Sequence, residues 1–176
     1  MLFGKNKKFL SWSALDLWSK DKEKYRRRYY EGIKEKESFY VLFGKEVHQQ
    51  LETNTNLSHI PRFEIPEMKI EIEISGIPIL GYIDSFSPTK KEFIDFKTGI
   101  KKPDGSSRWT QLDVEKHQQL DFYSLCIKEK FGKVSPTCKL VWLETAWREE
   151  KEERGGSSII FSKKLALTGH FEVFRR

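Results

Sequence analysis

The sequence predicts a mixed α/β fold in which helices flank a central mixed β-sheet containing an antiparallel meander. Apolar residues recur at helical spacing in 13–31, 39–53 and 113–131. Residues 67–97 instead alternate with a period of two between short turns, and further strand-like segments follow the third helix. The 176 residues, 38% of them hydrophobic, are enough for a single domain spanning 1–176 with its own core.

The first predicted helix begins at Ser13, where Asp16 completes a capping-box pattern, and it stops before Gly32. One of its turns is crowded with arginines, interleaved with tyrosines: Arg26, Arg27 and Arg28. This turn is either a solvated basic face or a surface that contacts phosphates and stacked bases, and the sequence favours neither interpretation.

The second predicted helix covers residues 39–53. Phe43, Val47 and Leu51 are spaced four apart and form its buried stripe. His48 lies at the edge of that stripe, where a lone histidine is either a structural residue or a ligand. The polar segment that follows predicts a connector up to the first strand.

The meander consists of three predicted strands, at 67–74, 79–86 and 92–97. Asp84 and Asp95 lie near the ends of the second and third strands, so a modest bend or register offset brings their carboxylates together. Asp95 and Lys97 are two residues apart and share one face of a strand that is otherwise apolar. Charge in such a position is costly unless it is paired or used. Taken alone, a structural Asp–Lys pair is the commoner explanation.

A long polar loop, 98–112, follows this strand, and loops of this length in compact domains are mobile or functional. A helix then runs from Asp113 to about Phe131, and it places Gln119 and Tyr123 four apart on one face. The remainder predicts strands at 139–145, 157–161 and 165–174, with a charged hairpin tip at 148–154.

Composition limits the function classes. The excess of 32 Lys and Arg over 26 Asp and Glu gives a net charge of +6, which mildly favours a polyanionic partner. Cys126 and Cys138 have no CxxC spacing, so the sequence predicts neither a zinc site nor a disulfide framework. No apolar run approaches the roughly 20 residues of a membrane span, and the N-terminus lacks a signal-peptide core. We therefore expect the protein to be located in the cytoplasm, or in the nucleoid or the cytoplasm of a phage-infected host. We expect no membrane partner.

Five short motifs follow one another along the chain: Ser11-Trp12-Ser13-Ala14-Leu15, Phe43-Gly44-Lys45-Glu46-Val47-His48, Gly81-Tyr82-Ile83-Asp84, Asp95-Phe96-Lys97-Thr98-Gly99 and Gln119-Leu120-Asp121-Phe122-Tyr123. Their order and element types resemble the RecB-like branch of the PD-(D/E)XK nuclease superfamily, with its FGxxxH, GxxD, DxKTG and QxxxY motifs. The resemblance covers most of the chain and implies a restriction-endonuclease-like core.

The resemblance implies a divalent-metal-dependent deoxyribonuclease that hydrolyses phosphodiester bonds. It would be an exonuclease acting on DNA ends or single strands in recombination, repair or phage DNA processing. Mg²⁺ or Mn²⁺ would be the cofactor. Its implied ligands are His48, Asp84, Asp95 and the main-chain carbonyl of Phe96.

The remaining motif residues have implied roles in catalysis beside Asp84 and Asp95. Lys97 would orient or polarise the attacking water or stabilise charge on the phosphate, while Gln119 and Tyr123 would position the phosphate or brace the site. Phosphate and base contacts are expected from a further set: Arg26, Arg27, Arg28, Lys101, Lys102, Arg108 and Trp109.

The sequence departs from the family pattern in two respects, which concern the iron–sulfur cluster and the helicase motor. Ser19 and Lys20 stand where iron–sulfur members carry a Cys-Pro, and neither cysteine matches the C-terminal set, so no iron–sulfur cluster is expected. No GxxxxGK[ST] run is present, so a helicase would be a separate partner. The alternatives are a nuclease-like DNA-binding subunit that scaffolds a helicase or recombination complex with weak or no cleavage, and a nucleic-acid-binding protein whose Asp–Lys pairs are structural.

Overall fold

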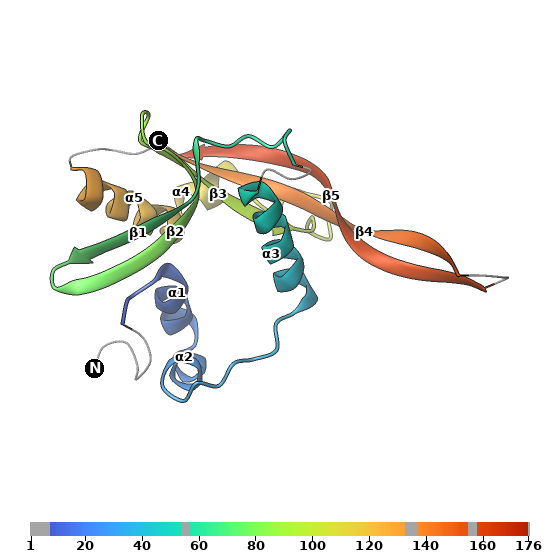
Figure 1. The fold of residues 1–176 in the computed structure, drawn as a ribbon, viewed down its shortest axis with the longest axis horizontal. Coiled ribbons are helices and arrows are strands. Elements are labelled where there is room, and N and C mark those ends of the chain that lie inside the picture. Colours follow the sequence, from blue (N-terminus) through green and yellow to red (C-terminus); the bar gives the residue numbers. More distant parts are fainter. Residues whose placement is uncertain (1–7, 54–56, 133–136, 155–157, 176) are drawn as a thin grey trace.

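The computed structural model describes the backbone of residues 8–53, 57–132, 137–154 and 158–175. It shows a mixed α/β fold, with helices packed around a five-stranded mixed sheet, which confirms the predicted fold class (Figure 1). The elements in chain order are α1 (Trp12–Lys20), α2 (Lys22–Tyr29), α3 (Phe39–Glu52), β1 (Ile65–Ile74), β2 (Ile77–Ser87), β3 (Glu92–Gly99), α4 (Gln111–Glu115), α5 (Gln118–Phe131), β4 (Cys138–Arg154) and β5 (Ser158–Arg175). None of the helices in the described ranges is long and apolar enough to cross a bilayer.

The strands lie in the order β1-β2-β3-β4-β5. The predicted meander of β1, β2 and β3 is antiparallel, and its first turn is the dipeptide Ser75-Gly76, where both residues have positive φ as a tight hairpin requires. β3 and β4 pair in parallel, and α4 and α5 occupy the crossover connection between them.

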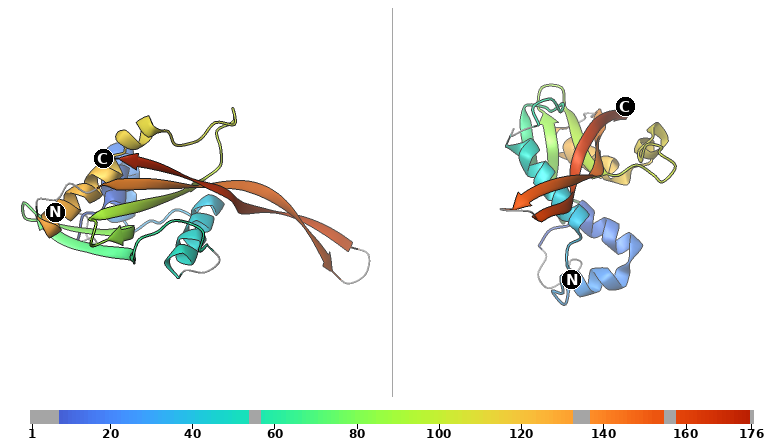
Figure 2. Two further views of the ribbon diagram at one scale, coloured as in Figure 1. Left: turned by 90° about the horizontal axis from the view of Figure 1, so that it is seen from above. Right: turned by 90° about the vertical axis from the view of Figure 1, so that its right-hand side faces the viewer.

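The two faces of the sheet carry separate hydrophobic clusters. On β3 and β4, Phe93 and Trp142 join the cluster that includes α5, whereas Ile94 and Val141 join the cluster that includes α3. This is the alternation expected of strands covered on both sides. α5 and α3 therefore lie on opposite faces of the sheet (Figure 2).

β2 and β3 pair over only three positions, the last of which joins Ser85 to Ile94. Beyond that pair the two strands separate, and we call this divergence the fork. Farther along the same strand, β2 pairs with the segment before α1: the Leu10 amide donates to the Pro78 carbonyl at 2.8 Å, and the Leu80 amide donates to the Leu10 carbonyl at 2.9 Å.

The single helix predicted at 13–31 is wrong, because the chain breaks at Asp21. Asp21 ends α1 and caps α2, where its carboxylate accepts from the Lys24 amide at 2.8 Å. The N-cap of α1 is Ser11 and not Ser13, and its side chain makes no capping hydrogen bond.

The helix predicted from Asp113 is also divided. Thr110 caps α4, with Asp113 as the acidic member of a capping box, and α5 starts afresh after His117. The predicted end at Gly132 is confirmed, since this residue follows α5 with φ of 86°.

β4 and β5 form a long hairpin that extends well beyond the rest of the molecule (Figure 1). Residues 148–154, predicted as a hairpin tip, are part of β4, and the two strands predicted at 157–161 and 165–174 are one strand, β5. The connecting residues 155–157 lie outside the described part of the chain.

Candidate active site at the fork

The fork positions the first carboxylate. Asp84 is the first residue of β2 beyond the last pair with β3, and its Oδ2 accepts a hydrogen bond from the Phe96 amide at 2.7 Å. A side-chain oxygen thus satisfies a β3 backbone donor that no strand partner satisfies there. The local unpairing of the strands fixes the Asp84 carboxylate between them.

The second carboxylate belongs to a closed set of polar contacts on the α5 face. Asp95 is 3% exposed, and its Oδ2 lies 2.9 Å from Lys97 Nζ. Gln119 of α5 completes the set, because its amide nitrogen donates to Asp95 Oδ1 at 2.9 Å and its oxygen accepts from Lys97 at 2.7 Å. The structure therefore brings Asp95, Lys97 and Gln119 together, of which the two-residue spacing predicted a shared face for Asp95 and Lys97.

Burial dominates the electrostatics of this set. It raises the pKa of Asp95 to about 6, an effect that Lys97 opposes and the neighbouring Asp84 charge reinforces. Burial likewise raises the pKa of Tyr123 above its ordinary value, so the phenol stays protonated at neutral pH.

His48 approaches Asp84 from the other face of the sheet. Its Nδ1 lies 3.5 Å from Asp84 Oδ1. Burial by itself would lower the pKa of His48, but its contact with the Asp84 carboxylate, together with the charge of Asp95, raises that pKa above the ordinary value. The site therefore favours positive charge at this position.

A cavity of about 40 Å³ lies beside His48 and Asp84, and two glutamates that the motif analysis missed also line it. Glu52 follows His48 by one turn of α3, a spacing that would have revealed it. Glu67 lies opposite Asp84, between the paired positions Pro66–Ser85 and Met68–Ile83, and has φ of 44°. Burial, followed by the neighbouring Glu52, raises the pKa of Glu67. No sequence pattern marks Glu67.

Two motif glycines make the contacts that assemble the site. A Cβ on Gly81 would lie 2.9 Å from the Tyr123 ring, so only glycine lets the QxxxY helix approach β2 this closely. A Cβ on Gly44 would lie 3.1 Å from Thr98 Oγ1, so the glycine of FGxxxH seats α3 against the DxKTG strand. The motifs therefore meet one another in space as well as following one another in sequence.

Only some of the predicted metal ligands lie around the same cavity. His48, Asp84 and Phe96 line the 40 Å³ cavity, which exceeds the roughly 10–15 Å³ that one water needs, and imidazole and carboxylate donors suit Mn²⁺ and Mg²⁺. Asp95 does not line the cavity and contacts Lys97 and Gln119 instead. Within the described ranges, no group of three or more His, Cys, Asp or Glu side chains is arranged to hold a metal ion. His48 and Asp84 therefore suit such a cation in their donor chemistry, but the described side chains do not form a complete ligand set around it.

The predicted nucleic-acid contacts differ in their surroundings. Arg26 pairs with Glu23 and Glu31, and Lys101 Nζ lies 3.4 Å from Glu144. The Arg26 pairs are largely exposed to solvent and therefore weak, so phosphates can compete for this cation. Lys102 and Arg108 are exposed, whereas Trp109 is half-buried against the core and the His117 ring.

Arg27 and Arg28 line a hollow of about 650 Å³ whose walls carry four further cations: Lys24, Lys34, Lys36 and Lys45. Two glutamates, Glu35 and Glu37, also line it, and they pair with Lys24 and Lys45 respectively. The lining is positive on balance, so phosphate contact at Arg27 and Arg28 stays a prediction with a suitable surface.

Comparison of the sequence with protein-family models finds no match, and comparison with curated proteins finds none either. The resemblance to RecB-like nucleases therefore consists of the five motifs themselves.

Proposed function

We propose that this protein is a divalent-metal-dependent deoxyribonuclease with a restriction-endonuclease-like core. The observation that carries the proposal is the position of Asp84, whose carboxylate bonds to the Phe96 amide at the fork. There it lies between His48 on one side and the neighbouring Asp95, held by Lys97 and Gln119, on the other. Structural ion pairs alone give no reason for an imidazole, two carboxylates and an amine to gather where a sheet opens.

A Mg²⁺ or Mn²⁺ ion held by His48, Asp84 and the Phe96 carbonyl, with Asp95 nearby, would neutralise phosphate charge and lower the pKa of a water molecule. Lys97 adds a positive charge that stabilises the developing negative charge on the phosphate. Gln119 fixes Lys97 through a 2.7 Å hydrogen bond. The protonated Tyr123 phenol can donate to a phosphate oxygen.

The motif resemblance alone supports the finer expectations: exonucleolytic action on DNA ends or single strands, a role in recombination, repair or phage DNA processing, and association with a helicase or recombination protein. The same resemblance supports the alternative of a DNA-binding scaffold with weak or no cleavage. Cleavage assays separate these two functions.

The test is incubation of end-labelled single-stranded and duplex DNA with the protein in Mg²⁺, Mn²⁺ or EDTA. We expect products that need the metal and that are lost in Lys97→Ala. Lys128→Ala, which removes an exposed lysine from α5, is the matched control and should cut like the parent. DNA binding without metal-dependent products would support the scaffold instead.

A further inference from the structure

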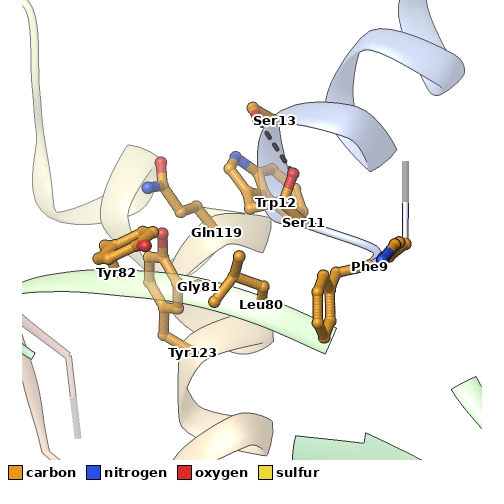
Figure 3. A pocket seen from close by; sticks show the side chains of 10 residues that line it. Phe9, Ser11, Trp12, Ser13, Leu80, Gly81, Tyr82, Gln119 and Tyr123 are labelled. Carbon is orange, nitrogen blue, oxygen red and sulfur yellow. Dashed lines mark hydrogen bonds between the residues drawn. The ribbon is translucent and has the colours of Figure 1, made fainter. Parts of the chain in front are cut away.

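A second and larger cavity adjoins the candidate active site. Its volume is about 600 Å³, within the range of about 300–1,000 Å³ that is usual for small-molecule sites. Three elements line it: the segment around Trp12, residues 80–82 of β2, and Gln119 with Tyr123 of α5 (Figure 3). The cavity therefore lies where β2 has parted from β3 and faces the start of α1.

The walls suit a flat aromatic ligand with polar edges. Trp12 and Tyr82 provide large rings from different elements, and Leu80 adds an aliphatic surface between them (Figure 3). Polar groups are few: they include the hydroxyls of Ser11 and Ser13, which are hydrogen-bonded to each other at 3.1 Å, and the Gln119 amide. An apolar chamber with a few convergent polar groups is typical of sites that stack a ring and hydrogen-bond its edge.

The cavity borders the candidate active site at Gln119 and Tyr123. Gln119 lines the cavity and also bonds to both Asp95 and Lys97. Tyr82 precedes Asp84 by two residues on β2, so the two side chains leave the same side of the strand about 7 Å apart. A ligand ring against Tyr82 would place an attached phosphate within reach of the Asp84 carboxylate at the fork.

The charge of the surroundings suits an anionic substituent on that ring. Lys8 is exposed and lines the cavity, and the chain carries a net charge of +6. A DNA strand combines aromatic bases with anionic phosphodiesters and therefore fits both features of the cavity. A base that is paired and stacked in a duplex cannot enter a chamber walled on several sides.

We propose, on the basis of the proposed nuclease function, that this cavity holds one unpaired nucleobase of a DNA strand, whose phosphodiester then lies at the fork beside Asp84. The substrate is accordingly single-stranded DNA or a frayed duplex end. Tyr82 and Trp12 are the stacking residues, and the Gln119 amide faces the edge of the base.

The test measures binding in EDTA, where no cleavage takes place. The probes are a fluorescent ten-residue oligothymidylate, the same strand with abasic residues throughout, and a ten-base-pair blunt duplex. We expect the parent to bind the oligothymidylate at least five-fold more tightly than either of the other two. Equal affinity for the normal and abasic strands would overturn the proposal.

Variants at Tyr82 locate the effect. Tyr82 is 46% exposed, so its removal should leave the fold intact. Tyr82→Ala should bind the normal and abasic strands nearly alike, and Tyr82→Phe should restore the preference because the ring is retained. Tyr40→Ala, at a tyrosine that is 51% exposed and meets Trp147 edge to face, is the control and should behave like the parent.

Failure of this inference is distinguishable from failure of the proposed function. A parent that cuts DNA while Tyr82→Ala keeps the full preference for bases would refute the cavity assignment and leave the nuclease proposal standing. A parent that never cuts, but whose base preference disappears in Tyr82→Ala, would refute the nuclease and retain the cavity as a single-strand binding site.

Discussion

The candidate active site has two halves of opposite character, one on each face of the sheet. On the α3 face, the His48 and Asp84 side chains are 39% and 20% exposed and border a small cavity. On the α5 face, Asp95 is almost fully buried and makes its contacts within the protein, with Lys97 and Gln119. The first half has room for a ligand, whereas the second already holds its groups in place.

This difference indicates a division of labour. In the open half, His48 and Asp84 are donors that suit a cation, and the cavity beside them leaves room for one. In the closed half, Gln119 holds the Lys97 ammonium group in place without any ligand. Pre-oriented charges in a site cost no reorganisation when reaction charge develops. The two halves should therefore respond differently to substitution.

Loss of Lys97 should have the largest effect. Lys97→Ala removes the pre-oriented charge and should lower the rate of DNA cleavage by about 100- to 1,000-fold. Metal affinity at the open half should change little. Cleavage is measured with end-labelled DNA at saturating Mn²⁺, and circular dichroism checks folding. A rate within tenfold of the parent would remove Lys97 from the catalytic group.

Loss of His48 tests the open half. His48→Ala should raise the Mn²⁺ concentration needed for half-maximal cleavage by about 10-fold or more, because one ligand is lost. DNA affinity in EDTA should stay the same. Calorimetric titration of the protein with Mn²⁺ gives the affinity directly, and an unchanged value would make His48 a structural residue.

The buried carboxylate predicts a pH effect on stability. Because burial raises the pKa of Asp95 to about 6, folding disfavours its ionised form, and stability should fall as pH rises from about 4 through 6. In EDTA, Asp95→Asn lacks this titration. The Tm of the variant minus that of the parent should therefore increase by several degrees from pH 4 to pH 8.

Thermal melts at each pH measure this gap, and Glu129→Gln, at an exposed carboxylate of α5, is the control. A gap that is the same at pH 4 and pH 8 would show that Asp95 is ionised without cost in the folded protein.

The smallest effect concerns the close packing of α3 against β3. Gly44→Ala gains about 1 kcal/mol in helix propensity but brings a methyl group to 3.1 Å from Thr98 Oγ1, so the net change in unfolding free energy should be near zero. In a Thr98→Ala background the contact is relieved, and the same substitution should be stabilising. Urea denaturation of the four proteins gives the coupling, and equal effects in both backgrounds would exclude the contact.

The meander was predictable because its residues encode it locally. Residues 67–74 alternate strictly, and Ser75-Gly76 turns the chain, so strand existence and pairing both follow from neighbouring positions. Parallel pairing of β3 with β4 has no such local signal, because the two strands are joined through two helices and a long loop.

The errors have physical causes. Asp21 breaks the first helix without a proline or glycine, through a capping bond that competes with helix continuation. All residues of 148–154 are charged, so their β structure depends on cross-strand pairing with β5. A search for hydrophobic periodicity misses such a strand.

The sequence indicates which residues lie near one another in the candidate site better than it indicates how they are arranged. The DxK spacing placed Asp95 and Lys97 on one face, and four-residue spacing would have found Glu52 from His48. The division of the carboxylates between two faces arises from the fork, which depends on where strand pairing stops. Single residues do not encode that point.

The backbone bridge at Leu10 has a consequence for cooperativity. The segment that leads into α1 pairs with β2 through the two hydrogen bonds at Leu10, so the amide hydrogen of Leu80 reports whether that segment is attached. We expect it to exchange with solvent faster than amides in the central strands. A molecule touching both Trp12 and Tyr82 would slow that exchange, because it would hold the segment before α1 against β2.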